Sequence, residues 1–284
     1  MIDTAQQARV IRYYEASHKS FTRVWSGKVD RAIHFGFYDR NARSHSRSLL
    51  RLNEILADIG GVDRGDHVID AGCGFGGSAV WLAKHRDCSV VGINITEPHL
   101  DIARSHAEAM GMADRVSFVH ADFAAIPLPP NCADIYWAVE STVHASDRAA
   151  VIGEAFRVLK PGGRFVIVEY CPAIDIDKIR GYEEILSGWA MPALWTTERY
   201  LDALNAIGFR EVRHIDATQN IAPSLRRMRR MCRAAVPITR TLLAWNMYDP
   251  ARVAHNVASL FLADAMLGGE LSYVIFSGTK PTTD

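Results

Sequence analysis

A turn with three closely spaced glycines follows a short apolar run within residues 67–78 and constrains the fold more than any other stretch. It reads HVIDAGCGFGGS, so an acid, Asp70, ends the apolar run. Without side chains at Gly72, Gly74 and Gly76, the backbone can take a positive φ and lie directly against a ligand. The pattern predicts a buried strand, a glycine turn and a helix start that bind a nucleotide-like ligand; a turn that only packs tightly is the alternative.

The same letters match the dinucleotide pattern G-x-G-x-x-G through Gly72, Gly74 and Gly77. Two features argue against a dinucleotide. The carboxylate of Asp70 stands where a pyrophosphate needs a helix N-terminus free of negative charge, and Asn94 replaces the acid expected about twenty residues further on. A phosphate-free nucleoside that carries a sulfonium group, S-adenosylmethionine (SAM), therefore fits the turn better.

The charge and cysteine content exclude several classes of protein. Lys plus Arg and Asp plus Glu both number 32 in 284 residues, so no global field attracts nucleic acid or a membrane surface. The five cysteines are scattered and form no C-x-x-C pair, which suits a reducing cytosol and argues against a structural zinc site. The first residues lack a basic segment before an apolar core, and no apolar run is long enough to span a membrane. We expect a soluble, cytoplasmic protein.

From residue 67 onward, apolar runs alternate with helical patterns, which predicts an α/β fold with helices on both faces of a mostly parallel sheet. Ligands of such sheets bind outside the carboxyl ends of the strands. The expected strands lie near residues 67–71, 88–93, 115–119, 133–138, 163–170, 209–216 and 271–278. The expected helices between the first five lie near residues 77–85, 97–110 and 147–159.

Additional segments surround this core. An N-terminal helical cover is expected over residues 1–43, ahead of a ligand-binding core over 44–284 with cap insertions at about 172–195 and 220–268. The cover is rich in aromatic residues, which could stack on a ligand. Packing of a helix against the edge of the domain explains them equally well.

Together with KPGG at 160–163, these features resemble the class I SAM-dependent methyltransferases over roughly residues 44–280. The chain looks most like the small-molecule C-methyltransferases of the ubiquinone, tocopherol, sterol and prenyl type. The segments that carry this resemblance are the Tyr13-Tyr14 pair, HFGFY at 34–38, GINIT at 92–96 and ADF at 121–123. The resemblance implies a Rossmann-like, seven-stranded sheet and SAM as the cofactor.

The resemblance also implies which residues bind SAM. The resemblance places Asp70, Gly72, Gly74 and Gly76 around the methionine and ribose parts of SAM. Asn94 takes the position of the acid that grips the ribose hydroxyls in many members, and an amide can still hydrogen-bond them. His99 stands where relatives carry glutamine, beside the nucleoside. Asp122 would accept from the adenine amino group with Phe123 against the ring; a surface loop acid is the alternative for Asp122.

Carbon methylation of an alkene produces a carbocation, which needs aromatic faces around it and a base at the right carbon. The groups available at strand ends and in the cover are Glu140, His144, Glu169, Tyr170, Tyr14 and Trp25. Glu169 ends the fifth strand and is the first candidate for the base, with anchoring of the cap as the alternative. His144 is the second candidate, with Tyr14 as a third catalytic residue.

An arginine cluster at residues 224–233 is the strongest local charge. Arg226, Arg230 and Arg233 share one helical face and could bind a phosphate or diphosphate. A solvated or subunit-contacting face is the alternative. Mg²⁺ would then bridge a free diphosphate to the protein, although the sequence shows no dedicated metal site. The Asn/Asp-Pro-Pro-aromatic signature of base amino methyltransferases is missing, which argues against nucleic acid.

These features give the hypothesis of SAM-dependent C-methylation of an isoprenoid, either a prenyl diphosphate or a prenylated natural product, through a carbocation that a carboxylate deprotonates. The expected acceptor contacts are Trp25, His34, Tyr38, Tyr170, Arg226, Arg230 and Arg233. One alternative is O- or N-methylation of a small secondary metabolite with His144 as base. A catalytically silent SAM-binding module is the other. The expected partner is a small molecule, without nucleic acid or membrane, and a homo-oligomer is allowed.

Overall fold

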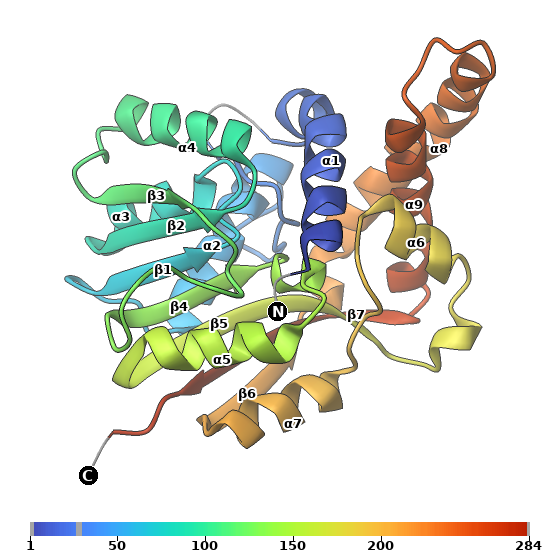
Figure 1. Cartoon of the computed structure of the whole chain (residues 1–284). Helices are drawn as coiled ribbons and strands as arrows, with labels where there is room; N and C mark the ends of the chain where they lie inside the picture. Colours follow the sequence, from blue (N-terminus) through green and yellow to red (C-terminus); the bar gives the residue numbers. More distant parts are fainter. Residues whose placement is uncertain (1–2, 27–29, 283–284) are drawn as a thin grey trace.

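The computed structural model describes residues 3–26 and 30–282. In these ranges, seven strands form one sheet in the order β3-β2-β1-β4-β5-β7-β6 (Figure 1). The strands are β1 (His67–Ala71), β2 (Ser89–Asn94), β3 (Val116–His120), β4 (Ala133–Val139), β5 (Leu159–Pro172), β6 (Arg210–Asp216) and β7 (Leu271–Thr279). Strands β1 to β5 pair in parallel, and β7 runs antiparallel to both β5 and β6. The mostly parallel, Rossmann-like sheet expected from the sequence is confirmed.

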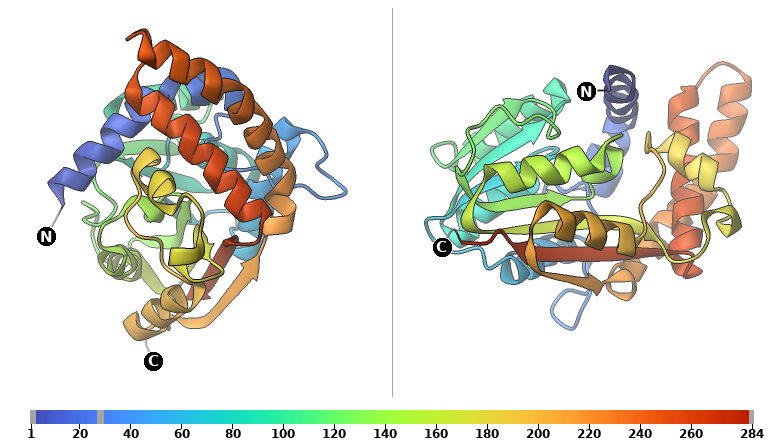
Figure 2. Two further views of the ribbon diagram at one scale, coloured as in Figure 1. Left: turned by 90° about the vertical axis from the view of Figure 1, so that its right-hand side faces the viewer. Right: turned by 60° about the horizontal axis from the view of Figure 1, so that its bottom comes forward.

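Helices cover both faces of this sheet, as the alternation predicted (Figure 2). The helices concerned are α2 (His45–Ile59), α3 (Gly77–Arg86), α4 (Glu97–Ala109), α5 (Arg148–Val158) and α7 (Thr197–Ile207). Buried side chains of α2, α3 and α4 join one hydrophobic cluster, and those of α5 and α7 join the other. Both clusters include alternate residues of the same strands, because successive side chains of a strand point to opposite faces.

Local signals in the sequence set several helix ends. Ser44 accepts a hydrogen bond from the backbone N–H of Arg47 at the start of α2, and Thr196 accepts one from Arg199 at the start of α7. Helix α7 ends at Gly208, whose φ of 115° a residue with a side chain rarely adopts. Side-chain capping and glycine therefore decide where these helices begin and end.

Further helices lie beyond the carboxyl ends of the parallel strands and on one side of the sheet (Figures 1 and 2). They are α1 (Thr4–Ser20), η1 (Phe21–Trp25), η3 (Ile176–Lys178), α6 (Tyr182–Gly188), α8 (Thr218–Ala244) and α9 (Pro250–Leu267). Helices α8 and α9 form a hairpin that projects from the body, and α6 packs on α9. Helices occupy the segments expected to form the N-terminal cover and the caps. The division of the chain at residue 43 stays a prediction. Residues 1–2, 27–29 and 283–284 of the expected segments lie outside the described ranges. No helix in those ranges is both long and apolar enough to cross a membrane.

Candidate functional site

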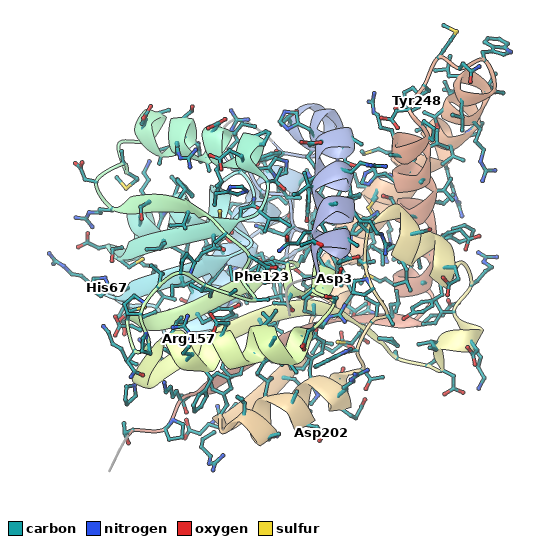
Figure 3. The ribbon with its side chains drawn as sticks, viewed as in Figure 1. Asp3, His67, Phe123, Arg157, Asp202 and Tyr248 are labelled. Carbon is teal, nitrogen blue, oxygen red and sulfur yellow. The ribbon has the colours of Figure 1, made fainter. Side chains whose placement is uncertain are left out.

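A cavity of about 1090 Å³ lies at the carboxyl ends of the parallel strands, between the sheet, α1 and the α8–α9 hairpin. In Figure 3 the labels mark Asp3 at the start of α1 and Phe123 in the loop after β3, and both residues line this cavity. The side chains that surround it come from segments far apart in the sequence. The cavity is therefore the natural candidate for the ligand site.

The glycine turn forms one end of the cavity. Gly72 and Gly74 line it with φ values of 88° and 54°. A Cβ on Gly72 would lie 2.3 Å from the Cβ of Ser141, so the backbone passes too close to this residue for any side chain. Gly76 differs from the prediction, because it does not line the cavity: a Cβ there would meet Ala103 and Phe118 inside the protein. Its role is close packing of α3 against α4 and β3.

The carboxylate of Asp70 lies beside this turn and is 3% exposed. Its Oδ2 atom has no hydrogen-bond partner among the described residues. Burial raises the pKa of Asp70 to about 7. An unpaired, buried carboxylate at a backbone-lined turn fits a ligand that brings a positive charge or a hydroxyl group, as predicted for SAM.

Asn94 and His99 line the same part of the cavity, in agreement with the expected nucleoside contacts. The Nδ2 of Asn94 donates to the carbonyl of Gly74 at 3.4 Å, which ties the end of β2 to the glycine turn. His99 is buried, its Nε2 has no described partner, and burial lowers its pKa to about 3. The imidazole is therefore neutral at physiological pH, and can offer a donor or an acceptor to a ligand.

Asp122 and Phe123 line the cavity in the loop after β3. The Oδ1 of Asp122 accepts from the backbone N–H of Ala124 at 2.8 Å, and its Oδ2 accepts from Nε2 of Gln7 at 2.6 Å. Helix α1 thus reaches across the cavity to the residue expected to bind adenine. The sequence analysis did not identify Gln7, because nothing local to α1 indicates a partner 115 positions away.

Tyr14 and His144 meet in the cavity, with the Tyr14 hydroxyl 3.0 Å from Nε2 of His144. The Nδ1 of His144 lies 3.4 Å from the carbonyl of Ala190. Because a carbonyl can only accept, Nδ1 carries the proton and Nε2 accepts from Tyr14. Burial lowers the pKa of His144 to about 4 and raises the pKa of Tyr14. The two residues form a neutral pair in the cavity, and their catalytic roles stay a prediction.

Glu140 is the cavity carboxylate that the sequence analysis considered without selecting. It follows β4, the middle strand of the sheet, and lines the cavity. Its Oε1 accepts from the Tyr273 hydroxyl at 2.7 Å and from the Phe35 backbone N–H at 2.8 Å, and its Oε2 accepts from the Tyr170 hydroxyl. Burial raises the pKa of Glu140 to about 7, although these hydrogen bonds oppose the shift. Its place directly after the central strand was the available signal.

Glu169 was predicted to face the site as the catalytic base, and this prediction is wrong. Tyr170 lines the cavity, so the preceding residue of the strand points to the other face of the sheet. Glu169 is fully buried there, and its Oε1 accepts from the Thr142 hydroxyl at 2.7 Å and the Val143 N–H at 3.0 Å. The carboxyl end of a strand places two successive residues on opposite sides, and only one of them reaches the ligand.

Of the aromatic acceptor contacts, Trp25, His34 and Tyr170 line the cavity as predicted. The indole Nε1 of Trp25 donates to the carbonyl of His34 at 3.0 Å, which joins η1 to the following loop. Tyr38 does not line the cavity. Its backbone N–H donates to the carbonyl of Asn220 at 2.8 Å, and this pairing with α8 holds the residue outside the cavity wall.

The predicted arginine clamp does not reach the cavity. Arg226, Arg230 and Arg233 are exposed and lie outside the cavity lining. The opposite face of α8 lines the cavity and presents, at helical spacing, Met228, Cys232, Ala235 and Thr239. Among the described arginines, the cavity lining includes Arg31 and Arg252.

The remaining wall of the cavity is largely aromatic and apolar, and of its residues only the rings of the N-terminal cover were considered as ligand contacts from the sequence. It includes Tyr13, Phe21, Phe35, Trp189, Met228, Met231 and His255. The ring of His255 stacks on Trp189 at 6.0 Å between centroids.

Within residues 3–26 and 30–282, no three His, Cys, Asp or Glu side chains are grouped so that they could hold a metal ion.

Comparisons with known proteins relate this site to one family. The family described as "Methyltransferase domain" matches residues 69–167. The 27-O-demethylrifamycin SV methyltransferase of Amycolatopsis mediterranei is 31% identical over 216 residues, which cover 74% of this chain and 77% of the relative. The sterol 24-C-methyltransferase of Eremothecium gossypii is 31% identical over 228 residues, 77% of this chain and 61% of the relative. The chain thus spans little more than half the length of the sterol methyltransferases that it matches.

Solved structures show the same fold over nearly the whole chain. The [4+2]-cyclase SpnF matches with a TM-score of 0.81 and 24% identity, over 98% of this chain and 97% of that one. A geranyl diphosphate C-methyltransferase from Streptomyces coelicolor A3(2) matches with a TM-score of 0.72 and 21% identity, over 99% and 100% of the two chains.

Proposed function

The chain belongs to the class I SAM-dependent methyltransferases, and on that basis we propose that it C-methylates a bulky isoprenoid acceptor through a carbocation. The observation that supports this reaction is Glu140, a half-buried carboxylate that is hydrogen-bonded to the hydroxyls of Tyr170 and Tyr273 and lies in the same cavity as the glycine turn. The acceptor and the methylated atom are part of the proposal.

The residues present fit SAM. The left-handed backbone of Gly72 and Gly74 leaves no Cβ in its way, and Asp70 offers an unpaired oxygen to a cationic group. Asn94 and Asp122 supply polar groups for the ribose and the adenine. When bound, SAM supplies the electrophilic methyl group, so the chain itself must position the acceptor, stabilise positive charge and accept a proton.

The size and lining of the cavity favour a bulky apolar acceptor. Ligand sites commonly measure about 300–1,000 Å³, and this cavity measures about 1090 Å³. It can therefore hold a cofactor together with a second large molecule. The wall opposite the glycine turn consists mainly of rings and thioethers, such as Trp189, Met228 and Met231. These groups exclude water and pack against hydrocarbon.

Two sets of side chains carry the proposed chemistry. The carboxylate of Glu140 and the neighbouring ring of Tyr170 line the cavity where the acceptor would bind. Both groups can stabilise a positive charge that develops on the acceptor. The Tyr14 hydroxyl accepts the proton that leaves the acceptor and passes its own proton to Nε2 of His144. A carbocation is a strong acid, so a histidine whose pKa is lowered to about 4 is still basic enough.

The position of the three predicted arginines gives no support to a free diphosphate, and the described cations that an anionic group could meet in the cavity are instead Arg31 and Arg252. The three arginines expected to bind a diphosphate lie on the outer face of α8. A terpenoid or a prenylated natural product needs no such contact. Mg²⁺ enters the proposal only if the acceptor carries a free diphosphate.

O-methylation of a small hydroxylated metabolite is the second candidate. The pair of Tyr14 and His144 favours it, because the Tyr14 hydroxyl can take a proton from a hydroxyl group of the acceptor and pass its own proton to Nε2 of His144. The 27-O-demethylrifamycin SV methyltransferase, similar over most of its length, is named for such a reaction. This reaction has no requirement for the charge of Glu140.

The substitution Glu140→Gln separates the two reactions, because it removes the charge and keeps the size. We would measure S-adenosylhomocysteine release and product mass with farnesol, farnesyl diphosphate with and without Mg²⁺, and a phenol. C-methylation should fall about 100-fold or more while the Kd for SAM stays within about twofold. Glu211→Gln, at an exposed residue that also has a positive φ, is the matched control.

If the Glu140→Gln variant methylates the phenol at the wild-type rate and farnesol is not turned over, the proposed reaction is O-methylation and not C-methylation. Tight SAM binding without turnover of any acceptor would indicate a catalytically silent module.

A further inference from the structure

An acidic and a basic side chain are buried beneath the turn that carries His144, on the face of the sheet that the cavity does not reach. Glu169 of β5 is 0% exposed and Arg148, the first residue of α5, is 2% exposed. The proposed chemistry uses neither of them. A buried charge is costly unless it is paired and hydrogen-bonded, so their shared surroundings need an explanation.

Both side chains bond to the same short turn, η2 (Thr142–His144), which follows β4. Oε1 of Glu169 accepts from the Thr142 hydroxyl at 2.7 Å and from the Val143 N–H at 3.0 Å. The guanidinium of Arg148 donates to the carbonyl of Val143 at 2.6 Å. Glu169 thus satisfies donors of the turn, and Arg148 satisfies an acceptor of the same turn.

The turn needs this external support. A 3₁₀ turn of three residues has few hydrogen bonds of its own, and their geometry is poorer than in an α-helix. Arg148 is itself fixed, because it also donates to the carbonyl of Ala193 at 2.8 Å. The contacts from the opposite face therefore help to fix the turn, together with the hydrogen bond that Nε2 of Gln6 donates to the carbonyl of His144 at 3.0 Å.

His144 is the last residue of this turn and the one that reaches into the cavity. We infer that Glu169 and Arg148 are positioning residues, which hold the turn so that Nε2 of His144 stays at the hydroxyl of Tyr14, a residue that lines the cavity. The inference rests on the proposed role of His144. It also explains why an acid stands at the end of β5 although it does not face the ligand.

The mildest way to release the turn is Thr142→Val, which removes one donor to Glu169 and keeps the shape of the side chain. Glu169→Gln is the second variant, because it keeps an acceptor oxygen and removes the carboxylate on which Arg148 acts electrostatically. Tyr136→Phe is the matched control, since this hydroxyl is buried and has no described partner. A displacement of about 1 Å can reduce a rate by up to about 100-fold.

Each substitution is made both in the wild type and together with His144→Ala. The single-turnover rate of farnesol methylation is measured in both backgrounds. Thr142→Val and Glu169→Gln should each lower the rate about tenfold or more, with the Kd for SAM and the KM for farnesol within about twofold. Residues that act as a unit are not additive, so neither should lower the rate further in the His144→Ala background. Equal losses in both backgrounds would overturn the inference, as would a rate like that of Tyr136→Phe.

A readout that needs no acceptor separates this inference from the proposed function. Long-range ¹H–¹⁵N NMR of histidine-labelled protein reports which ring nitrogen of His144 carries the proton, with His144→Ala for assignment. Thr142→Val and Glu169→Gln should shift the His144 signals away from the Nδ1–H form, whereas Tyr136→Phe should leave them in place. Unchanged His144 signals in both variants would overturn the positioning role even if no acceptor were turned over.

Discussion

The two ends of the cavity are built in different ways. The cofactor wall consists of the loops after β1, β2 and β3, where Asp70, Gly72, Asn94 and Asp122 follow strand ends. Its shape comes from the backbone, which takes left-handed conformations and leaves no room for side chains. The acceptor wall consists of faces of α1, α8 and α9 and of neighbouring segments such as Trp189 after α6, and its shape comes from packed side chains.

This difference indicates which part of the molecule can change its ligand. A wall made of backbone at strand ends cannot accept a new side chain without moving the sheet, whereas a wall of rings and thioethers can be reshaped by single substitutions. The family match agrees with this division, because residues 69–167 contain the cofactor wall and end before α6, α8 and α9. We therefore expect substitutions in the two walls to affect different constants.

The largest effect is expected from Gly72→Ala. A Cβ at this position would lie 2.3 Å from the Cβ of Ser141, in a residue whose φ is 88°. The Kd for SAM should rise at least about 100-fold, measured by isothermal titration calorimetry. Gly111→Ala is the control, because Gly111 has a φ of 68° and no atom near its added Cβ, so it carries only the backbone strain of about 1–2 kcal/mol. Similar SAM affinities in the two variants would mean that the cofactor wall is not set by its backbone.

Asp70→Asn should have the next largest effect, together with a change in pH dependence. Burial raises the pKa of Asp70 to about 7, and the ionised form is the one that attracts the cationic cofactor. SAM affinity should therefore increase about tenfold from pH 6 to pH 8 in the wild type, and stay flat and weak in Asp70→Asn. Asp114→Asn, at an exposed residue, should titrate like the wild type.

Protein stability provides a second test of Asp70 with the opposite sign. The folded pKa of about 7 lies above the value of about 3.9 in an unfolded chain, so the folded state without ligand holds this proton more tightly. The proton on Asp70 therefore contributes to the free energy of unfolding fully below pH 4, and this contribution is lost as the pH rises through 7. Relative to the wild type, the Tm of Asp70→Asn should rise between pH 5 and pH 8; a constant difference would argue against the raised pKa.

A smaller and different effect is expected in the acceptor wall. Met228→Ala removes a buried side chain from the cavity lining. The KM for an isoprenoid acceptor should rise roughly tenfold, since lost methylene contacts in a pocket cost about 1–3 kcal/mol, while the Kd for SAM stays unchanged. Met247→Ala, at a residue 69% exposed on the hairpin, is the control. A weakened SAM affinity in Met228→Ala would show that the two walls are not independent.

The smallest effect is expected from replacing Arg226, Arg230 and Arg233 together by alanine. These side chains are exposed on the outer face of α8, so kcat/KM should stay within about twofold for every acceptor. A loss of more than about tenfold confined to farnesyl diphosphate would restore the arginine clamp, and with it a diphosphate acceptor.

The sequence alone determined the α/β fold and most of the cofactor wall. The alternation of strands and helices, the glycine turn with Asp70, and Asp122 after the third strand are local signals, because the residues concerned stand within a few positions of a strand end. The structure confirms the sheet, and it places Asp70, Gly72, Gly74, Asn94 and His99 together at the cavity. Local backbone chemistry was sufficient for this half of the site.

Only the tertiary structure decided the other half. Whether Glu140 or Glu169 faces the acceptor depends on the face to which a strand residue points, and whether α8 presents its arginines or its methionines depends on how the helix docks. Gln7 and Tyr14 reach Asp122 and His144 across more than one hundred positions of the chain. Such contacts arise from packing between distant segments, and no residue near either partner in the sequence specifies them.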